Sequence, residues 1–317
     1  MPGPYIASKS KQRGSPMRTI TALFVGLGSI GTRHLKNLTN LCADRGWTLQ
    51  ADALRSDLSR PLRDGVAALL HAQYTDLADA PAHYDMVFIT NPTSLHADAL
   101  TRVRGRGGAL FIEKPIFSAE QTGLDLADCL PAGQKAYVAA PMRWCGVMLA
   151  LKDRLPGLHP YCARVICSSY LPDWRPGVDY RTVYSAHKAM GGGVTIDLIH
   201  EWDYLVELFG VPEQLYNFKG TYSDLEIDSD DLSVYIARYP TLLAEVHLDY
   251  FGRGYRRSIE LFCHDGSYLA DFGAGTLTLP DGTVLRVSDV HEQAGVIWHT
   301  VDALPVAAAP GAAVAGC

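Results

Sequence analysis

The sequence predicts a parallel, doubly wound α/β domain followed by an α+β domain with a largely antiparallel, open sheet. The chain has 317 residues, about twice the roughly 150 residues of a typical domain. Short apolar runs alternate with longer amphipathic stretches up to residue 141, which is typical of strand-helix-strand units. Beyond that point, extended segments follow one another with turn signals between them, which favours an antiparallel sheet.

In the first domain, which we place at residues 17–141, each apolar run predicts a strand and each amphipathic stretch a helix. The expected strands are 20–25, 49–54, 86–90, 109–112 and 136–140, and the expected helices include 32–42 and 94–103. The second domain, residues 142–295, starts with few clear signals. One helix is expected at 194–209, followed by strands at 214–222, 230–238, 241–250 and 255–263 and shorter ones up to 287.

Composition narrows the function classes. Hydrophobic residues make up 48% of the chain, and 28 basic against 34 acidic residues give a net charge of −6, so neither nucleic-acid nor anionic-membrane binding is expected. No apolar run approaches the roughly 18 residues of a membrane-spanning helix, and we expect a cytoplasmic protein. The seven cysteines form no CxxC pair, so neither a metal site nor a disulfide framework is expected.

Both ends of the chain are expected to be disordered. Residues 1–16 are rich in Ser, Gly, Pro and Lys and precede Met17, so they are a mobile extension or reflect a misplaced start codon. Residues 296–317 end in a run of Ala, Pro, Gly and Val without periodicity.

The motif Gly26-Leu27-Gly28-Ser29-Ile30-Gly31 lies between the first predicted strand and the first predicted helix. Glycines at these positions permit a tight turn, close approach of the backbone to a pyrophosphate and close helix-strand packing. The N-terminus of the helix adds N–H donors and the positive end of a dipole. The motif therefore predicts a dinucleotide site of the Rossmann type.

The end of the second strand bears on the choice of coenzyme. Arg55-Ser56 stands where NAD-preferring folds place a carboxylate on the ribose, which favours NADP. Alternatively, Arg55 stacks on the adenine or faces water while Asp52 or Asp57 meets the ribose, and NAD is then the coenzyme.

Further motifs follow at the carboxyl ends of later strands and in the second domain. They are Thr90-Asn91-Pro92 with His96, Glu113-Lys114-Pro115, Gly191-Gly192-Gly193, and Asp197 with His200. Together with the glycine loop, these motifs make residues 19–290 resemble the glucose-fructose oxidoreductase, inositol dehydrogenase and MocA (Gfo/Idh/MocA) family. The stretch 171–186 is similar to that of members found with bacterial surface-sugar biosynthesis genes.

The resemblance implies an NAD(P)-dependent oxidoreductase that acts on CH–OH groups, with Glu113 and Lys114 at the reaction centre and Arg143-Trp144 near cofactor and substrate. Asn91, Pro92 and His96 would line the path to the nicotinamide. The full set of expected cofactor contacts is Gly26, Gly28, Ser29, Ile30, Gly31, Arg55, Ser56, Thr90, Asn91, Pro92, His96, Glu113, Lys114, Arg143 and Trp144.

Hydride transfer from a carbinol also requires a group that exchanges the hydroxyl proton and a cation or donor that stabilises the alkoxide. We expect His200 to exchange the proton, Lys114 to polarise the oxygen and Asp197 to orient the pair or the sugar. At 100° per residue, Asp197, His200 and Tyr204 share one stripe of the predicted helix. The family usually has its histidine four residues after the aspartate. Here Glu201 occupies that position, so Glu201 is held as an alternative acid/base.

Aromatic and basic residues between 171 and 188 could stack on a sugar or pair with a substrate phosphate; alternatively, they form a loop that packs its own aromatics. The expected substrate contacts are Arg175, Tyr180, Tyr184, Lys188 and Tyr204. The function predicted is hydride transfer with a sugar, cyclitol or nucleotide sugar. The alternatives are a dinucleotide-binding regulator and a sugar elimination or hydrolysis without net redox change. The resemblance also implies pairing through the open sheet into a homodimer or larger oligomer.

Overall fold

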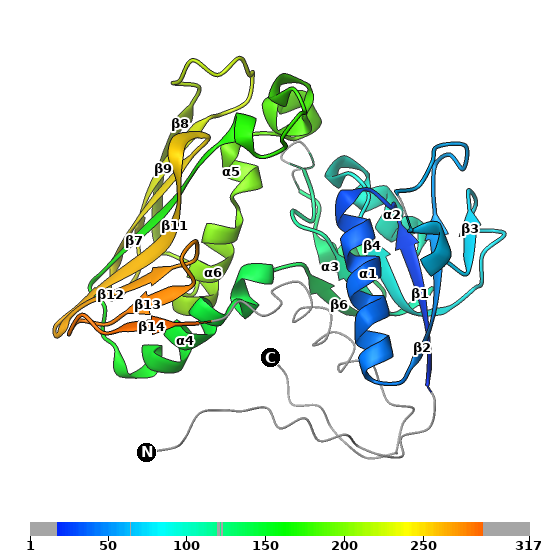
Figure 1. The fold of residues 1–317 in the computed structure, drawn as a ribbon, viewed down its shortest axis with the longest axis horizontal. Helices are drawn as coiled ribbons and strands as arrows, with labels where there is room; N and C mark the ends of the chain where they lie inside the picture. Colours follow the sequence, from blue (N-terminus) through cyan, green and yellow to red (C-terminus); the bar gives the residue numbers. More distant parts are fainter. Residues whose placement is uncertain (1–17, 64, 119–120, 122, 288–317) are drawn as a thin grey trace.

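A computed structural model describes residues 18–63, 65–118, 121 and 123–287 of the chain, and the expectations for residues 1–16 and 296–317 lie outside them. The described residues form two sheets with their helices, side by side in Figure 1. No helix in this part of the chain is long and apolar enough to cross a membrane.

The first sheet is parallel throughout and has the strand order β3-β2-β1-β4-β5-β6. This order confirms the predicted doubly wound domain. Of its strands, β3 has no counterpart among the predicted ones. The strands are β1 Thr19–Val25, β2 Thr48–Leu54, β3 Ala72–Tyr74, β4 Tyr84–Ile89, β5 Gly107–Ile112 and β6 Lys135–Val138, and the helices are α1 Ser29–Asp44, α2 His96–Arg102 and α3 Leu126–Cys129.

Both faces of this sheet are covered, as a parallel sheet requires. On the side of α1, the rings of Phe24 and Phe88 stack with centroids 4.4 Å apart, and Phe111 follows at 5.2 Å from Phe88. Leu35 of α1 is buried in the same core cluster. This packing fixes α1, and with it the glycine loop, at the carboxyl end of β1.

The second sheet has eight strands in the order β14-β13-β12-β11-β7-β10-β9-β8. Only the β7–β10 pair is parallel, so the predicted, largely antiparallel sheet is confirmed. Neither β7 nor helix α4 was among the predicted elements. The strands are β7 Cys162–Tyr170, β8 Gln214–Gly220, β9 Leu232–Arg238, β10 Leu243–Asp249, β11 Phe251–Cys263, β12 Gly266–Asp271, β13 Thr276–Thr278 and β14 Val284–Arg286.

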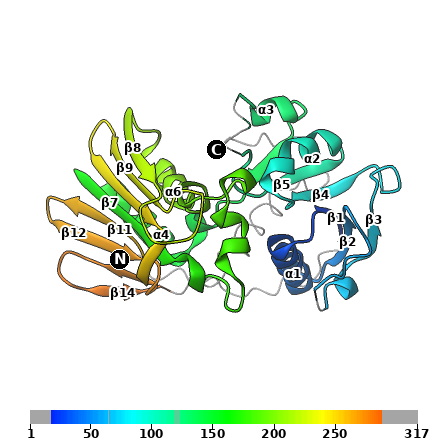
Figure 2. The same ribbon diagram turned by 90° about the horizontal axis from the view of Figure 1, so that it is seen from above.

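Helices α4 Gly146–Arg154, α5 Val194–Asp197 and α6 His200–Phe209 lie on the side of this sheet that is turned toward the parallel sheet (Figures 1 and 2). The single helix predicted at 194–209 is therefore wrong. Leu198 has φ −98° and ψ 30°, which interrupts the helix between Asp197 and His200. As a result, these two side chains do not lie on one continuous helical stripe.

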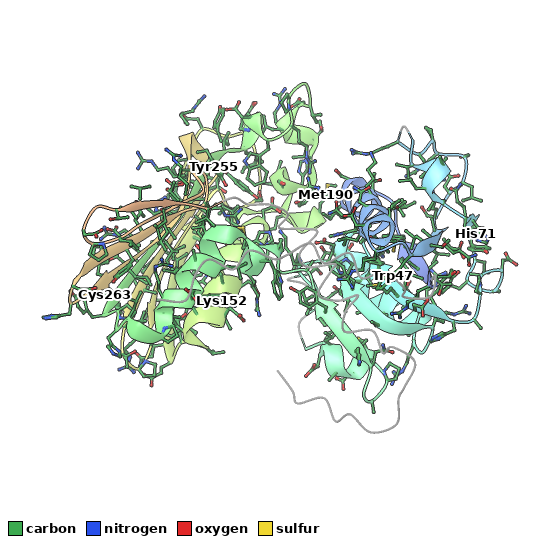
Figure 3. All side chains as sticks on the ribbon, turned by 60° about the horizontal axis from the view of Figure 1, so that its bottom comes forward. Trp47, His71, Lys152, Met190, Tyr255 and Cys263 are labelled. Atoms are coloured by element: carbon green, nitrogen blue, oxygen red, sulfur yellow. The ribbon has the colours of Figure 1, made fainter. Side chains whose placement is uncertain are left out.

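The remaining segments include eight short 3₁₀ turns, four of which are in the segment 171–190 that connects β7 to α5. The turns are η1 Ala67–Leu69, η2 Thr93–Leu95, η3 Pro141–Trp144, η4 Leu155–Gly157, η5 Leu171–Asp173, η6 Tyr180–Thr182, η7 Tyr184–Ala186 and η8 Lys188–Met190. In Figure 3, Met190 lies on the side of the second domain that is turned toward the parallel sheet.

Candidate active site

The glycine loop has the geometry of a pyrophosphate site. Gly26 has φ +88°, and a Cβ there would lie 2.8 Å from the Cα of Asn91. A Cβ on Gly31 would lie 2.5 Å from the carbonyl oxygen of Gly26, so this glycine permits close packing of α1. A Cβ on Gly28 would meet nothing within 4 Å, and no side chain caps α1 there. The loop therefore presents open backbone and free N–H donors of Ser29 and Ile30, which fit a dinucleotide phosphate.

The end of β2 carries a restrained arginine. The guanidinium of Arg55 donates to Oε1 of Gln73 at 2.8 Å and to the carbonyl of Arg60, while Ser56 beside it is exposed. Asp52 is buried and accepts a hydrogen bond from the hydroxyl of Tyr84 at 2.8 Å. This removes Asp52 from the candidates for a ribose contact.

The loops after β4 and β5 are tied together by His96. Its Nε2 lies 2.9 Å from the carbonyl oxygen of Asn91 and its Nδ1 lies 3.0 Å from that of Ile116. Thr90 donates to the carbonyl of Gly26 at 2.6 Å, so the glycine loop belongs to the same framework. Because the side chain of His96 is 1% exposed, the expectation that it lines the path to the nicotinamide is wrong. Its two hydrogen bonds hold the loops together inside the protein. Pro92, in contrast, is exposed.

Glu113 is held by a residue that the sequence analysis did not single out. Its Oε1 lies 2.5 Å from Nε2 of His34, which is completely buried on the inner side of α1. The other carboxylate oxygen accepts the backbone N–H of Lys114 at 3.2 Å. Glu113 therefore connects α1 to the turn that presents the lysine.

Lys114 extends from the first domain into the second. Its Nζ donates to the backbone carbonyl of Asp197 at 3.0 Å, and the peptide bond to Pro115 is cis. Burial lowers the pKa of the ammonium, which the carboxylates of Asp197 and Glu113 partly offset. The lysine is thus a desolvated cation close to α5 and α6.

Asp197 accepts hydrogen bonds from two tyrosines. The hydroxyl of Tyr184 is 2.8 Å from Oδ1 and that of Tyr250 is 2.6 Å from Oδ2. Burial, and then the charge of Asp197, raise the pKa of both phenols, so they remain donors. Tyr250 directly follows strand β10, and the sequence analysis did not assign it a role.

His200 faces a cavity of about 440 Å³, a size suited to a small ligand. Burial, followed by the charges of Lys114 and Arg257, lowers the pKa of the imidazole well below its usual value. The lowered pKa keeps the ring neutral. Because the ring hydrogen-bonds to none of the described residues, it is free to accept a proton. The cavity is lined by Cys167, Ser169, Tyr170, Asp173, Trp174, Asp197, Leu198, His200, Gly252, Arg253, Tyr255 and Arg257.

Two predictions on α6 are wrong. Glu201 is completely buried and paired with Arg257, at 2.6 Å from Nε to Oε1, so it is not available as an alternative acid/base. Tyr204 is also completely buried, with its ring centroid 5.4 Å from that of Phe272, so it does not contact the substrate.

Arg143 and Trp144 join the domains and are not free to meet a ligand as expected. The guanidinium of Arg143 forms ion pairs with Asp203 at 2.6 Å and Glu207 at 2.7 Å, both on α6. Trp144 donates its Nε1–H to the hydroxyl of Tyr137 at 2.6 Å. Both side chains are thus bound within the protein.

Of the expected substrate contacts in the segment 171–190, only Tyr184 reaches the site, through Asp197. Arg175 lies over the ring of Tyr184 at 5.6 Å, and the hydroxyl of Tyr180 accepts the backbone N–H of Glu226 at 3.2 Å. Neither these two residues nor the exposed Lys188 lines the cavity. In the described part of the chain, no group of His, Cys, Asp and Glu residues could hold a metal ion.

Comparison with known proteins gives the site its context. Residues 20–138 match the model of the GFO_IDH_MocA family, an oxidoreductase family with an NAD-binding Rossmann fold. No curated protein sequence matches the chain.

Among solved structures, UDP-N-acetylglucosamine 3-dehydrogenase GnnA from Acidithiobacillus ferrooxidans is 16% identical, with a TM-score of 0.69 over 90% of this chain and 89% of that one. The WlbA dehydrogenase from Bordetella pertussis, in complex with NADH and UDP-GlcNAcA, is 19% identical, with a TM-score of 0.66 over 80% and 78%. Biliverdin reductase from Synechocystis sp. PCC 6803, in complex with biliverdin and NADP+, is 16% identical, with a TM-score of 0.70 over 90% and 89%.

These structural likenesses establish the fold of both domains, and the family match covers the domain that contains the glycine loop and Lys114. Over residues 20–138 the resemblance that the motifs predict is therefore confirmed: this part of the chain matches the Gfo/Idh/MocA oxidoreductase family and its NAD-binding Rossmann fold.

Proposed function

We propose that this protein transfers a hydride between a nicotinamide coenzyme and a hydroxyl-bearing carbon of a sugar, cyclitol or nucleotide sugar. The observation that carries the proposal is an unpaired His200 in the cavity wall with the desolvated ammonium of Lys114 near enough for its charge to act on the imidazole. Lys114 comes from the first domain and donates to the carbonyl of Asp197, which lines the same cavity as His200. Two solved structures of the same fold, GnnA and WlbA, are dehydrogenases whose names or bound ligands include UDP sugars.

The residues divide the chemistry between them. His200 takes the hydroxyl proton of the substrate on a ring nitrogen as the C–H hydride leaves, and Lys114 stabilises the negative charge that develops on the oxygen. The nicotinamide, when bound, supplies the hydride acceptor. The products are the carbonyl compound, the reduced coenzyme and a protonated His200, which then loses its proton to solvent. Asp197, held by Tyr184 and Tyr250, orients the sugar through its carboxylate.

For the coenzyme we propose NADP, with NAD as the alternative. Arg55 and Ser56 supply a cation and a hydroxyl at the end of β2, where a 2′-phosphate is recognised in this fold. Biliverdin reductase of similar fold is complexed with NADP+ and WlbA with NADH, so the fold accommodates both. Calorimetric titration of the protein and of Arg55→Ala with each coenzyme tests this proposal. We expect Arg55→Ala to lose more affinity for NADPH than for NADH. Equal losses of affinity for the two coenzymes would contradict the preference for NADP.

We further propose that the protein acts in the cytoplasm as a homodimer or larger oligomer assembled through the second sheet. The outer face and edge of this sheet carry large exposed apolar side chains, including Tyr216 and Phe218 of β8 and Ile236 of β9. Light scattering of the purified protein tests the assembly, and Phe218→Asp should shift it toward the monomer.

The test of the activity is cofactor reduction in the presence of a panel of sugars, cyclitols and nucleotide sugars, followed at the absorbance of reduced nicotinamide. Stoichiometric reduction with one substrate supports hydride transfer. Coenzyme binding without reduction by any substrate would contradict it and would instead favour a regulator or a reaction without net redox change.

A further inference from the structure

Arg253 presents an unpaired guanidinium to the cavity. It forms no hydrogen bond or ion pair with any residue that the structure describes, and its Cζ lies 3.6 Å from the ring centroid of Tyr170. Of the arginines nearby, Arg257 is paired with Glu201 and Arg164 with Glu245, whereas the exposed Arg256, like Arg253, has no such partner among the described residues. A guanidinium stacked on a ring keeps its N–H edges free, in the fork geometry that suits phosphate and carboxylate oxygens.

The backbone that carries Arg253 is firmly built. The pairing of β11 with β7 shifts register between Phe251 and Arg256, and Arg253 lies within this irregularity. The buried carboxylate of Asp249 accepts the N–H of Phe251 at 3.1 Å and that of Gly252 at 2.7 Å. A Cβ on Gly252 would lie 1.9 Å from Oγ of Ser168, so only glycine fits there. Arg253 is therefore positioned before any ligand arrives, which lowers the entropic cost of binding.

The same cavity contains His200, and its other lining side chains suit a sugar. Trp174 and Tyr255 offer aromatic faces, and the carboxylate of Asp173 offers hydroxyl acceptors. His200 and Arg253 both line this one cavity of about 440 Å³. A single substrate bound there can therefore place its reacting carbon at His200 and another substituent at Arg253.

We propose that Arg253 binds an anionic group, a phosphate or a carboxylate, of the sugar substrate and so selects charged sugars over neutral ones. This inference rests on the proposed function, because it assigns the specificity of the same cavity. It predicts that a neutral sugar binds more weakly than its phosphorylated or carboxylated counterpart, and that the difference disappears without the guanidinium.

The experiment compares the full-length protein with Arg253→Gln and with the control Arg256→Gln. Arg256 is exposed on the same strand. It lines the hollow on the outer face of the sheet, which Arg253 also borders, but unlike Arg253 it does not line the cavity of His200. With the cofactor site saturated by NADPH, calorimetry measures the binding of glucose, glucose 1-phosphate, UDP-glucose and glucuronate. Because binding is measured directly, the readout does not depend on turnover.

We expect one or more of the charged sugars to bind the protein at least tenfold more tightly than glucose, and Arg253→Gln to abolish this advantage while Arg256→Gln changes it less than twofold. If Arg253→Gln loses the affinity advantage for the two phosphorylated sugars, the subsite binds phosphate. If it loses the advantage for glucuronate alone, the subsite binds carboxylate. Equal binding of charged and neutral sugars, no binding of any probe, or equal losses in both variants would overturn the inference. Failure of hydride transfer with intact, Arg253-dependent binding would instead contradict the proposed function.

Discussion

The two halves of the site use their polar side chains differently. In the parallel domain, Thr90, His96 and Glu113 all bond to other parts of the protein, and the surface left for the coenzyme is the backbone around Gly28. In the second domain, His200 and Arg253 line the cavity and form no hydrogen bond or ion pair with any described residue. The coenzyme half is thus a framework of buried bonds around exposed backbone, whereas the substrate half offers free side chains.

The largest expected effect is on catalysis in the substrate half. His200→Ala and Lys114→Met should each lower kcat by about 10²–10⁴-fold, since each removes a group that acts on the reacting oxygen or its proton. Coenzyme affinity should change little in His200→Ala. Steady-state kinetics measure this, with His83→Ala, an exposed histidine of the first domain, as the control. Near-normal turnover in either variant would remove that residue from the mechanism.

The buried pair behind His200 should dominate the stability of the substrate half. Arg257→Met leaves Glu201, whose side chain is 0% exposed, without its partner, at an expected cost of about 3–5 kcal/mol in the free energy of unfolding. The double variant Glu201→Gln/Arg257→Met should recover much of this loss. Chemical denaturation of the two variants checks the prediction, and equal losses would show that the pair acts through packing alone.

Two glycines test the framework of the coenzyme half. Gly31→Ala places a Cβ 2.5 Å from a carbonyl oxygen and should cost about 1–3 kcal/mol of stability. Gly28→Ala meets no protein atom within 4 Å, so the fold should keep its melting temperature while coenzyme affinity falls about tenfold or more. Calorimetry and thermal unfolding separate the two outcomes. A destabilised Gly28→Ala with normal coenzyme binding would contradict the open-backbone interpretation.

The smallest effect concerns pH. The pKa of His200 in the folded protein lies well below 6.5, so the unfolded chain binds its proton first as pH falls. The stability contribution of the neutral ring is intact above pH 6.5. Below pH 6.5 this stability contribution falls by up to about 1.4 kcal/mol per pH unit, until the pH reaches the pKa of His200 in the folded protein. Compared with His200→Asn, the wild-type protein should lose melting temperature faster between pH 6.5 and 5. Parallel curves would contradict the lowered pKa.

The difference between the halves also explains what the sequence could predict. The coenzyme half depends on contiguous motifs, so the glycine loop and the Glu113-Lys114 turn could be found directly. The buried hydrogen bonds that support these motifs could be predicted only in part. His34 follows Gly31 by three residues on the same helix, yet nothing in the sequence identifies Glu113 as the partner of His34.

The substrate half is assembled from residues far apart in the chain. Tyr250 donates a hydrogen bond to Asp197, and Arg257 pairs with Glu201; each pair is separated by more than fifty residues in the chain. Strand β7, whose apolar residues alternate with Arg164 and Ser168, has too weak a pattern to stand out. Tyr204 was assigned to the substrate because periodicity places it on a stripe with Asp197 and His200, and only the structure shows that its side chain is completely buried.

The hydrogen bond between Lys114 and Asp197 does not depend on the side chain at position 197. Lys114 bonds to the main-chain oxygen of Asp197 and not to its carboxylate. Any residue at position 197 offers the same oxygen, so the lysine keeps its anchor when that side chain is exchanged. A substitution there leaves the ammonium in place and changes the charge beside it, which partly offsets the lowered pKa of the lysine, so position 197 can tune this cation without moving it.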